Sequence, residues 1–260
     1  MSENVILIEH DGPVATVTLN RPEKRNALTF EMYDRLAEFC RGIDPQKGPR
    51  AVVIRGAGEK AFAAGTDISL FRNFNGGEDG LAYENKVDGV LSDIEACPVP
   101  TIAAITGACT GGGAAIAGLC DIRIGTRDMR FGFPIARTLG NCLSIASLQR
   151  MFALLGAART RELMLTARLV EAEEAFEIDL ITELYDDADT MFDRARSLAE
   201  EIAALAPITL RVTKEMFRRM SAAQPAIEDS DLISMCYGSA DFREGLEAFL
   251  AKRKANWSGK

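Results

Sequence analysis

The stretch PTIAAITGACTGGGAAIAGLCD, from Pro100 to Asp121, decides how the rest of this chain is organised. The β-branched and small residues from Thr101 to Thr106 predict a short buried strand, and an apolar helix that closes at Gly118 is expected after it. Between them stand three consecutive glycines, residues 111–113, which let a ligand approach the backbone where any side chain would collide. The unpaired N–H groups at the helix start favour an anion, or an oxygen that becomes anionic during a reaction.

Taken alone, the glycine triplet fits a buried helix in close packing contact equally well. It lacks the Lys-Ser/Thr ending of a phosphate loop, and it is not the spaced GxGxxG of a dinucleotide site. The uncharged run over residues 98–120 is long enough to cross a membrane, but its two prolines and five glycines fit a buried layer better. We therefore expect a soluble chain with no membrane partner.

The composition is that of an ordinary globular protein, with 47% apolar and 26% charged residues over 260 positions. This length suits one large domain or two modest ones. The formal net charge of −8 argues against a general nucleic-acid partner, because such binding needs a basic face that releases phosphate counterions. The first residues lead directly into a strand-like segment without a basic and apolar start, so no secretory signal is expected.

The cysteines and the single histidine limit the chemistry that the chain can use. Six cysteines are scattered without CxxC spacing, which is typical of a reducing compartment and predicts a cytoplasmic protein with no disulfide framework and no metal site. His10 precedes an Asp-Gly turn and is better explained as a strand-end residue than as a catalytic base. A Ser-His or Cys-His mechanism therefore lacks its usual partner.

The first half of the chain predicts alternating strands and helices. Val5–Glu9 and Val14–Leu19 flank Asp11-Gly12, a strong hairpin signal. Thr29 is expected to cap the helix that follows it, and Ala51–Arg55 predicts a short buried strand.

The first half continues with a helix at Leu81–Cys97, a strand at Ile122–Thr126 and an irregular segment at Arg130–Gly140.

The second half predicts almost entirely helix. The expected elements are helices from Leu143 onward, a strand at Ile181–Tyr185, a helix at Thr190–Leu205 stopped by Pro207, helical structure over Met216–Ser239 and a final helix at Asp241–Ala255.

Five motifs in this order resemble the enoyl-CoA hydratase/isomerase family, the crotonases, from about residue 5 to residue 259. They are NRPEKRNAL (20–28), KAFAAGTDI (60–68), PTIAAITGACTGGGAAIAGLCDIRIG (100–125), RFGFP (130–134) and DFREGLEAFLAKRKANWSG (241–259). The resemblance implies a mixed α/β fold, a crotonase-like spiral of ββα units with a C-terminal helical trimerisation region. It places the spiral core in residues 1–200 and the helical region in residues 201–260 of one integrated domain. It also implies a homotrimer or a dimer of trimers, that is a hexamer.

The resemblance further implies an acyl-CoA thioester as substrate, with coenzyme A arriving as part of it and no permanently bound cofactor. The backbone N–H groups of Thr66 and Gly112 would then form an oxyanion hole for the thioester. Coenzyme A would be bound by Lys24 and Arg25 at the phosphates, by Ala27, Ala64, Asp67 and Ile68 along the adenine and pantetheine, and by Lys252 of the same or a neighbouring subunit. From the residues alone, Lys24 and Arg25 fit an ordinary solvated charge cluster equally well.

The sequence departs from the family pattern at both catalytic glutamates. Their positions hold Ala115, two residues beyond the triplet's last glycine, and Ile135, after the RFGFP motif. Neither side chain transfers protons, so the two-carboxylate mechanism of water addition is not available in its usual form. Ala115 and Ile135 would instead shape an apolar substrate pocket that accepts a bulkier acyl group or keeps water out.

Polar residues downstream are candidate replacements. Arg137 would hold a substrate carboxylate, as a decarboxylase requires, and Asn141 is a second candidate for a catalytic role. Other candidates are Thr138, Cys142, Ser144, Glu84 and Asp88. For each residue a packed or hydrogen-bonded structural role stays open.

The sequence therefore predicts an acyl-CoA or enoyl-CoA enzyme that works through a thioester enolate. Alternatives are an acyl-CoA decarboxylase, a thioester hydrolase, or a non-catalytic protein that binds CoA thioesters.

Overall fold

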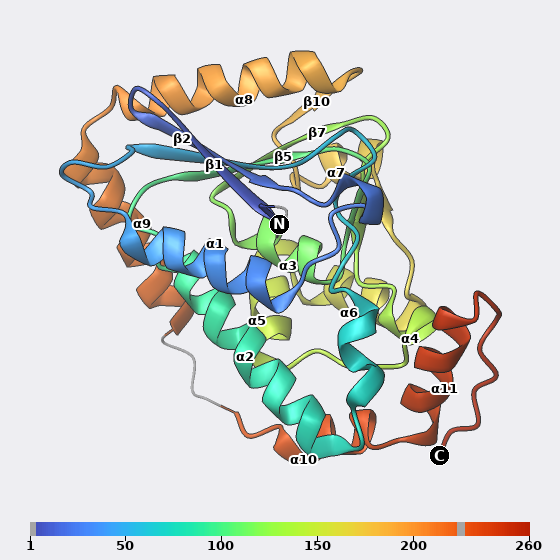
Figure 1. The fold of residues 1–260 in the computed structure, drawn as a ribbon. Coiled ribbons are helices and arrows are strands. Elements are labelled where there is room, and N and C mark those ends of the chain that lie inside the picture. The colour runs from blue at the N-terminus through green and yellow to red at the C-terminus, as the bar shows by residue number, and fades with distance from the viewer. Residues whose placement is uncertain (1–3, 223–226) are drawn as a thin grey trace.

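The computed structural model describes residues 4–222 and 227–260 and shows two β-sheets surrounded by helices (Figure 1). The larger sheet has the strand order β1-β2-β3-β5-β7-β10. Its strands are β1 (Ile6–Asp11), β2 (Val14–Leu19), β3 (Ala51–Gly56), β5 (Thr101–Ile105), β7 (Ile122–Thr126) and β10 (Glu183–Tyr185). The smaller sheet, β4-β6-β8-β9, is built from β4 (Ala61–Ala63), β6 (Ala108–Thr110), β8 (Arg130–Gly132) and β9 (Val170–Glu171).

Successive pairs of strands are divided between the two sheets, which produces the expected spiral. β3, β5 and β7 pair in parallel in the larger sheet, while β4, β6 and β8, which follow them, pair in parallel in the smaller one. All five residues of β5 are buried, and a strand covered on both faces needs such an uninterrupted apolar run. The fold is thus mixed α/β, as predicted.

Helices cover both faces of the larger sheet. On one face α8 (Ala188–Ala203) lies across the strands, and its buried Met191, Ala195 and Ala199 pack with sheet residues such as Ile102 and Ile124 (Figure 1). On the other face lie α1 (Phe30–Gly42), α2 (Gly77–Glu95) and α3 (Gly112–Leu119), which share the main core with the sheet. The junction between β6 and α3, which contains the glycine triplet, therefore lies on the same side of the larger sheet as α1 and α2.

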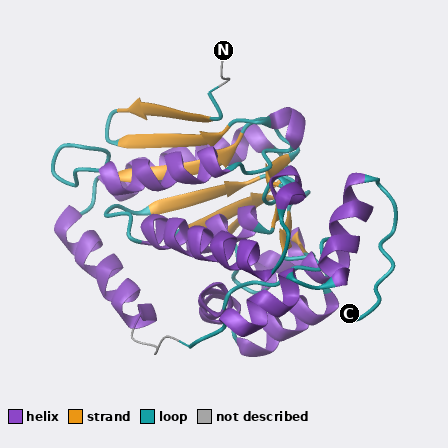
Figure 2. Ribbon diagram, turned by 60° about the horizontal axis from the view of Figure 1, so that its bottom comes forward, coloured by secondary structure: helices purple, strands orange, loops and turns teal. Residues whose placement is uncertain are grey.

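The chain has further helices, several of which lie beside the C-terminus (Figure 2). They are η1 (Pro22–Lys24) and η2 (Ile68–Asn73), both of the 3-10 type, and α4 (Ile135–Thr138), α5 (Ile145–Leu155), α6 (Ala157–Thr166), α7 (Ala172–Glu177), α9 (Pro207–Ala222), α10 (Ser230–Tyr237) and α11 (Ala240–Leu250). α10 packs on α2, and α11 packs on η2. The expected division at residue 200 falls inside α8, and separate regions remain a prediction. In the described ranges, no helix is both long and apolar enough to cross a bilayer.

Several local predictions are confirmed by the structure. β2 and β7 have the predicted bounds, and β1 pairs with β2 as a hairpin across Asp11 and Val14. Thr29 caps α1, because its side-chain oxygen accepts a hydrogen bond from the Met32 N–H at 3.2 Å.

Other local predictions are wrong. The segment 130–140 is not irregular, since it forms β8 and α4. Pro207 does not stop a helix: α8 ends at Ala203, and Pro207 is the first residue of α9, where a missing N–H costs no hydrogen bond. The final helix ends at Leu250, five residues earlier than predicted. The helical prediction over residues 223–226 lies outside the described residues.

Candidate active site

A cavity of about 590 Å³ opens beside the glycine triplet, between α2, α3 and the loop before α1. Most of the predicted site residues line it, namely Lys24, Arg25, Ala27, Ala64, Thr66, Asp67, Ile68, Gly112, Ala115, Ile135 and Asn141. Arg137 and Lys252 do not line it, and both are exposed residues. The structure therefore does not bring Arg137 to the position that a substrate carboxylate would need.

Two sequence motifs are joined along one edge of the cavity by backbone hydrogen bonds. The Leu28 N–H donates to Gly65 O at 2.8 Å, and the Asp67 N–H donates to Leu28 O at 2.8 Å. The Ala64 N–H donates to Arg25 O at 3.0 Å. NRPEKRNAL and KAFAAGTDI thus form one continuous wall, although more than 30 residues separate them in the chain.

Asn26 holds this wall in place, and the sequence interpretation missed it. Its side chain is fully buried, donates to Ala61 O at 2.8 Å and Ala57 O at 3.0 Å, and accepts from the Arg21 N–H at 3.0 Å. Its backbone has a φ of 54°, in the left-handed region that asparagine tolerates better than most residues. In the sequence, this role is indicated by an asparagine that stands within a charged loop.

The mouth of the cavity is cationic. Lys24, Arg25 and Arg72 line the mouth and are exposed, and Arg72 was not among the predicted residues. Asp67, which also lines it, forms an ion pair with Arg21 at 3.0 Å. Burial opposes ionisation of Asp67, but hydrogen bonds from Ser69 and the Arg21 guanidinium outweigh it and keep the pKa of Asp67 below its ordinary value. These three cations form no ion pair with the described residues, which suits them to phosphate groups.

Thr66 and Gly112 both line this cavity, and their backbone N–H groups are the expected oxyanion donors. Gly112 is the first residue of α3, where a helix leaves its N–H groups unpaired. Among the residues that the structure describes, neither N–H donates a hydrogen bond. Gly65 and Gly111 precede them with φ of 102° and 53°, a region of backbone space in which glycine carries little cost.

Gly112 and Gly113 leave no room for a side chain, and each has different neighbours. A Cβ on Gly113 would lie 2.3 Å from Ala63 O, so this glycine permits close packing of α3 on β4. A Cβ on Gly112 would lie 1.9 Å from the Tyr33 hydroxyl oxygen, at the wall of the cavity. Close packing therefore explains a glycine at both positions, and Gly112 in addition lines the cavity.

A chain of hydroxyl groups fixes the Thr66 side chain. The Tyr33 hydroxyl lies 2.9 Å from Thr66 Oγ1, which lies 2.8 Å from the Tyr83 hydroxyl. Burial raises the pKa of Tyr33 to about 12, so its hydroxyl stays protonated at neutral pH. The side chain of Thr66 is thus engaged with the protein, and its backbone N–H is the group left for a ligand.

The inner wall of the cavity is apolar where the family pattern has carboxylates. Ala115 is 9% exposed, Ile135 begins α4, and both line the cavity together with Val87, Leu91 and Leu143. Of the described lining residues, Asp67 and Glu84 carry the carboxyl groups. Because Asp67 is paired at the mouth, Glu84 is the carboxyl of the inner wall.

Glu84 lies on α2 and is 3% exposed. The Tyr237 hydroxyl donates to its Oε1 at 2.5 Å, and the Ser144 N–H donates to its Oε2 at 3.3 Å. Burial raises the pKa of Glu84 from 4.5 to about 7, although the hydrogen bond from Tyr237 opposes the rise. The group is therefore divided between its acid and its base form at neutral pH.

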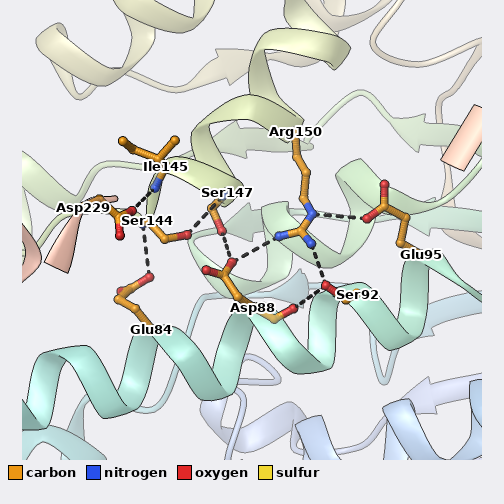
Figure 3. Close-up of polar contacts among 9 residues, drawn as sticks. All are labelled: Glu84, Asp88, Ser92, Glu95, Ser144, Ile145, Ser147, Arg150 and Asp229. Carbon is orange, nitrogen blue, oxygen red and sulfur yellow. Dashed lines mark hydrogen bonds and ion pairs between the residues drawn. The ribbon is translucent and has the colours of Figure 1, made fainter. Parts of the chain in front are cut away.

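The neighbouring carboxylates of α2 have structural partners on α5 (Figure 3). Asp88 accepts hydrogen bonds from Arg150 and from the Ser147 hydroxyl, each at 3.1 Å. Arg150 also donates to Ser92 at 2.9 Å and to Glu95 at 3.3 Å. Asp88 does not line the cavity, so its place is in the contact between helices.

Of the polar residues after α4, one lines the cavity and others hold the local structure in place. Asn141 lines the cavity and donates to the Tyr237 hydroxyl at 3.2 Å, while its Oδ1 is buried without a partner among the described residues. Ser144 caps α5, because its hydroxyl accepts from the Ser147 N–H at 3.1 Å. A hydrogen bond with Cys236 and burial raise the pKa of Cys142, so its thiol is a poor nucleophile.

The comparisons with known proteins agree along the whole chain. The family model described as enoyl-CoA hydratase/isomerase matches residues 9–260. The short-chain-enoyl-CoA hydratase of Clostridium acetobutylicum is 32% identical over 264 residues, covering 98% of this chain and 97% of that protein. Among solved structures, an enoyl-CoA hydratase/carnithine racemase from Magnetospirillum magneticum is 36% identical with a TM-score of 0.79, covering 100% of this chain and 97% of that one.

A methylmalonyl-CoA decarboxylase in complex with 2-nitronate-propionyl-CoA is also similar, at 25% identity and a TM-score of 0.89, with 100% of both chains covered. These matches extend over both sheets and the C-terminal helices. The chain belongs to the enoyl-CoA hydratase/isomerase family of enzymes.

Proposed function

We propose that this enzyme binds an acyl-CoA or enoyl-CoA thioester in the cavity and stabilises its enolate through the N–H groups of Thr66 and Gly112. The observation that carries the proposal is the presence of two unpaired backbone donors in one cavity, with a helix N-terminus behind one of them. Such donors favour an oxyanion over a neutral carbonyl, and losing one of them typically costs about 3 to 4 kcal/mol of transition-state stabilisation.

The mouth of the cavity supplies the groups that a coenzyme A tail needs. Lys24, Arg25 and Arg72 would bind its phosphates as exposed cations. The wall formed by residues 27 and 64–68 would lie along the adenine and pantetheine, with coenzyme A entering as part of the substrate. Lys252 lies outside this cavity in its own chain, so we propose that it reaches the phosphates of a neighbouring subunit.

The reaction is one that does not need two protein carboxylates. Water addition by a pair of glutamates is disfavoured, because Ala115 and Ile135 occupy their positions on the apolar wall. Movement of a double bond needs one group that takes and returns a proton, which suits this cavity. Decarboxylation of a malonyl-type thioester is a second candidate, supported by the similarity to methylmalonyl-CoA decarboxylase.

We also propose that the enzyme is a homotrimer or a dimer of trimers. The support is a set of apolar side chains on α9 that are exposed in the described part of the chain, namely Ile208, Val212, Met216, Phe217 and Met220. A single exposed apolar residue is ordinary, but five on one helix suit contact with a second copy. The six free cysteines support a reducing, cytoplasmic setting.

The test is product analysis with a panel of enoyl-, 3-hydroxyacyl- and malonyl-type CoA thioesters, using mass spectrometry. The wild-type protein is expected to convert at least one of them, and Gly112→Val is expected to lose that turnover by roughly 10²- to 10³-fold. Gly89→Val is the matched control, because a Cβ on this exposed glycine of α2 meets nothing within 4 Å. Normal turnover by a folded Gly112→Val protein would contradict the proposed oxyanion hole. Binding of the esters without any product would favour the non-catalytic alternative.

A further inference from the structure

We propose that Glu84 is the general acid–base of the reaction and exchanges a proton with the carbon next to the thioester carbonyl. The inference rests on the proposed acyl-CoA function and deepens it by naming the residue that moves the proton. It does not follow from the family pattern, whose two glutamate positions hold Ala115 and Ile135.

The position of Glu84 carries the inference. α2 presents Tyr83 and Glu84 to the cavity side by side, and both side chains are buried. The Tyr83 hydroxyl contacts the side chain of Thr66, whose N–H is a proposed oxyanion donor. Glu84 therefore lines the same cavity as Thr66 and Gly112, as proton transfer to an enolate bound there would require.

Glu84 is held by hydrogen bonds and not by an ion pair with a described residue. Tyr237 and the Ser144 N–H each donate to a different carboxyl oxygen, which leaves acceptor capacity on both oxygens. Within the described ranges, no lysine or arginine forms an ion pair with it. The other cavity carboxylate, Asp67, has its oxygens occupied by Arg21 and by the N–H and hydroxyl of Ser69.

The groups around Glu84 set its proton affinity. Burial is the largest influence, and the charges of Asp88 on its own helix and of Asp229 before α10 act in the same direction. Tyr237 of α10 and the Ser144 N–H before α5 act against them, which leaves the pKa of Glu84 at about 7. A group with this pKa serves as base and as acid at neutral pH.

The Glu84 carboxylate takes a proton from the α-carbon, so the C–H bond breaks, an O–H bond forms and the electron pair moves into the bond between the α-carbon and the carbonyl carbon. The carbonyl oxygen takes the negative charge at the Thr66 and Gly112 N–H groups. Return of the proton to the α-carbon, or to the γ-carbon of a 3-enoyl thioester, restores the carbonyl and the carboxylate. One carboxyl group therefore suffices for moving a double bond, whereas water addition needs a second group for the water.

The experiment measures deuterium uptake from D₂O into butyryl-CoA and phenylacetyl-CoA by mass spectrometry, since exchange reports formation of the enolate without requiring the natural substrate. Glu84→Gln is expected to slow exchange by roughly 10²- to 10⁴-fold, with thioester affinity within about twofold of the wild-type value. Glu78→Gln makes the same change at an exposed position of α2 outside the cavity and is expected to exchange at the wild-type rate.

The wild-type exchange rate is also expected to rise through an inflection near pH 7 as Glu84 loses its proton. Tyr237→Phe should move that inflection to higher pH, because it removes a hydrogen bond that favours the carboxylate. If Glu84→Gln exchanges as fast as the wild type, the role of Glu84 is overturned. The same holds if exchange by the wild type shows no inflection near pH 7. Either result leaves the proposed oxyanion hole standing. If the wild type neither exchanges nor forms any product, the proposed function fails together with this inference.

Discussion

At the residue scale, burial of the Glu84 carboxyl group lowers the stability of the fold. A carboxyl group that is 3% exposed loses its hydration, and the nearest helix partner, Asp88, is an acid instead of a base. Two hydrogen bonds, from Tyr237 and from the Ser144 N–H, offset only part of this cost, because the pKa of Glu84 still lies near 7. Such an arrangement lowers stability, as expected if Glu84 has the proposed catalytic role.

This cost predicts how stability depends on pH. The folded protein binds the Glu84 proton more tightly than the unfolded chain, since the pKa of Glu84 is raised from 4.5 to about 7. The stabilisation is complete below pH 4.5 and is lost as pH rises through 7, with a loss of about 3 kcal/mol in the free energy of unfolding. Urea unfolding at several pH values should show this fall in the wild type and in Glu78→Gln, but not in Glu84→Gln. Identical pH dependence in all three proteins would exclude a raised pKa at Glu84.

Gly112 and Tyr33 supply a second prediction at this scale. Gly112→Ala places a Cβ against the Tyr33 hydroxyl and is expected to destabilise the fold by about 1 to 3 kcal/mol. Tyr33→Phe removes that hydroxyl and should lower the cost of Gly112→Ala, although it loses the contact with Thr66. Urea unfolding of the four proteins in this cycle measures the coupling between the two residues. Strictly additive effects would show that the two residues are not in contact.

At the scale of elements, the contact between α2 and α5 supports the inner wall of the cavity (Figure 3). Asp229 lies just before α10 and accepts a hydrogen bond from the Ile145 N–H at 2.6 Å, at the first residue of α5. Arg150, in the middle of α5, joins that helix to α2 through Asp88, Ser92 and Glu95. The position of Glu84 thus depends on helices that are far apart in the chain.

The cap supplied by Asp229 is testable. Asp229→Ala is expected to lower the free energy of unfolding by about 1 kcal/mol, because an N–H at the start of α5 loses its acceptor. It should also lower the pKa of Glu84, since a nearby negative charge is removed. Thermal unfolding and the pH profile of exchange measure the two effects, with the exposed Asp231→Ala as control. An unchanged unfolding temperature would show that the cap contributes nothing measurable.

The elements differ in how far sequence predicts them. β2, β7 and the cap at Thr29 follow from local patterns that need no tertiary contact, and all three were predicted. β6 spans three residues beside the glycines and was missed, because its pairing with β4 and β8 supplies the signal that its sequence lacks. Pro207 was misread because proline favours a helix start as well as a helix stop.

At the scale of the whole molecule, the site is assembled from segments that sequence cannot bring together. The motifs indicate Thr66 and Gly112 as the proposed oxyanion donors, but the hydrogen-bond partner of Glu84 lies 153 residues away at Tyr237. Asn141 is likewise 96 residues from the same hydroxyl. Burial and these distant contacts give Glu84 its raised pKa, whereas its sequence neighbours show an ordinary amphipathic helix.

The outer face of α9 yields a prediction about assembly. Phe217→Asp places a charge on a face where Phe217 is 63% and Met220 is 71% exposed, and it is expected to convert the proposed trimer to monomers. Light scattering after gel filtration measures the mass directly. Leu165→Asp is the matched control, because it changes an exposed leucine on α6, away from that face. An unchanged trimer in Phe217→Asp would show that α9 is not the interface, and a monomeric wild type would contradict the proposal itself.

The most direct test of the central claim, that two backbone N–H groups polarise a thioester, is the infrared spectrum of an isotope-labelled thioester carbonyl in bound phenylacetyl-CoA. Hydrogen bonds from Thr66 and Gly112 weaken the C=O bond, so its stretching frequency should fall on binding to the wild type and to Glu84→Gln. When the ester binds to Gly112→Val, the stretching frequency should fall by less than it does on binding to the wild type. A carbonyl frequency that stays unchanged when the ester binds to the wild type would contradict the account.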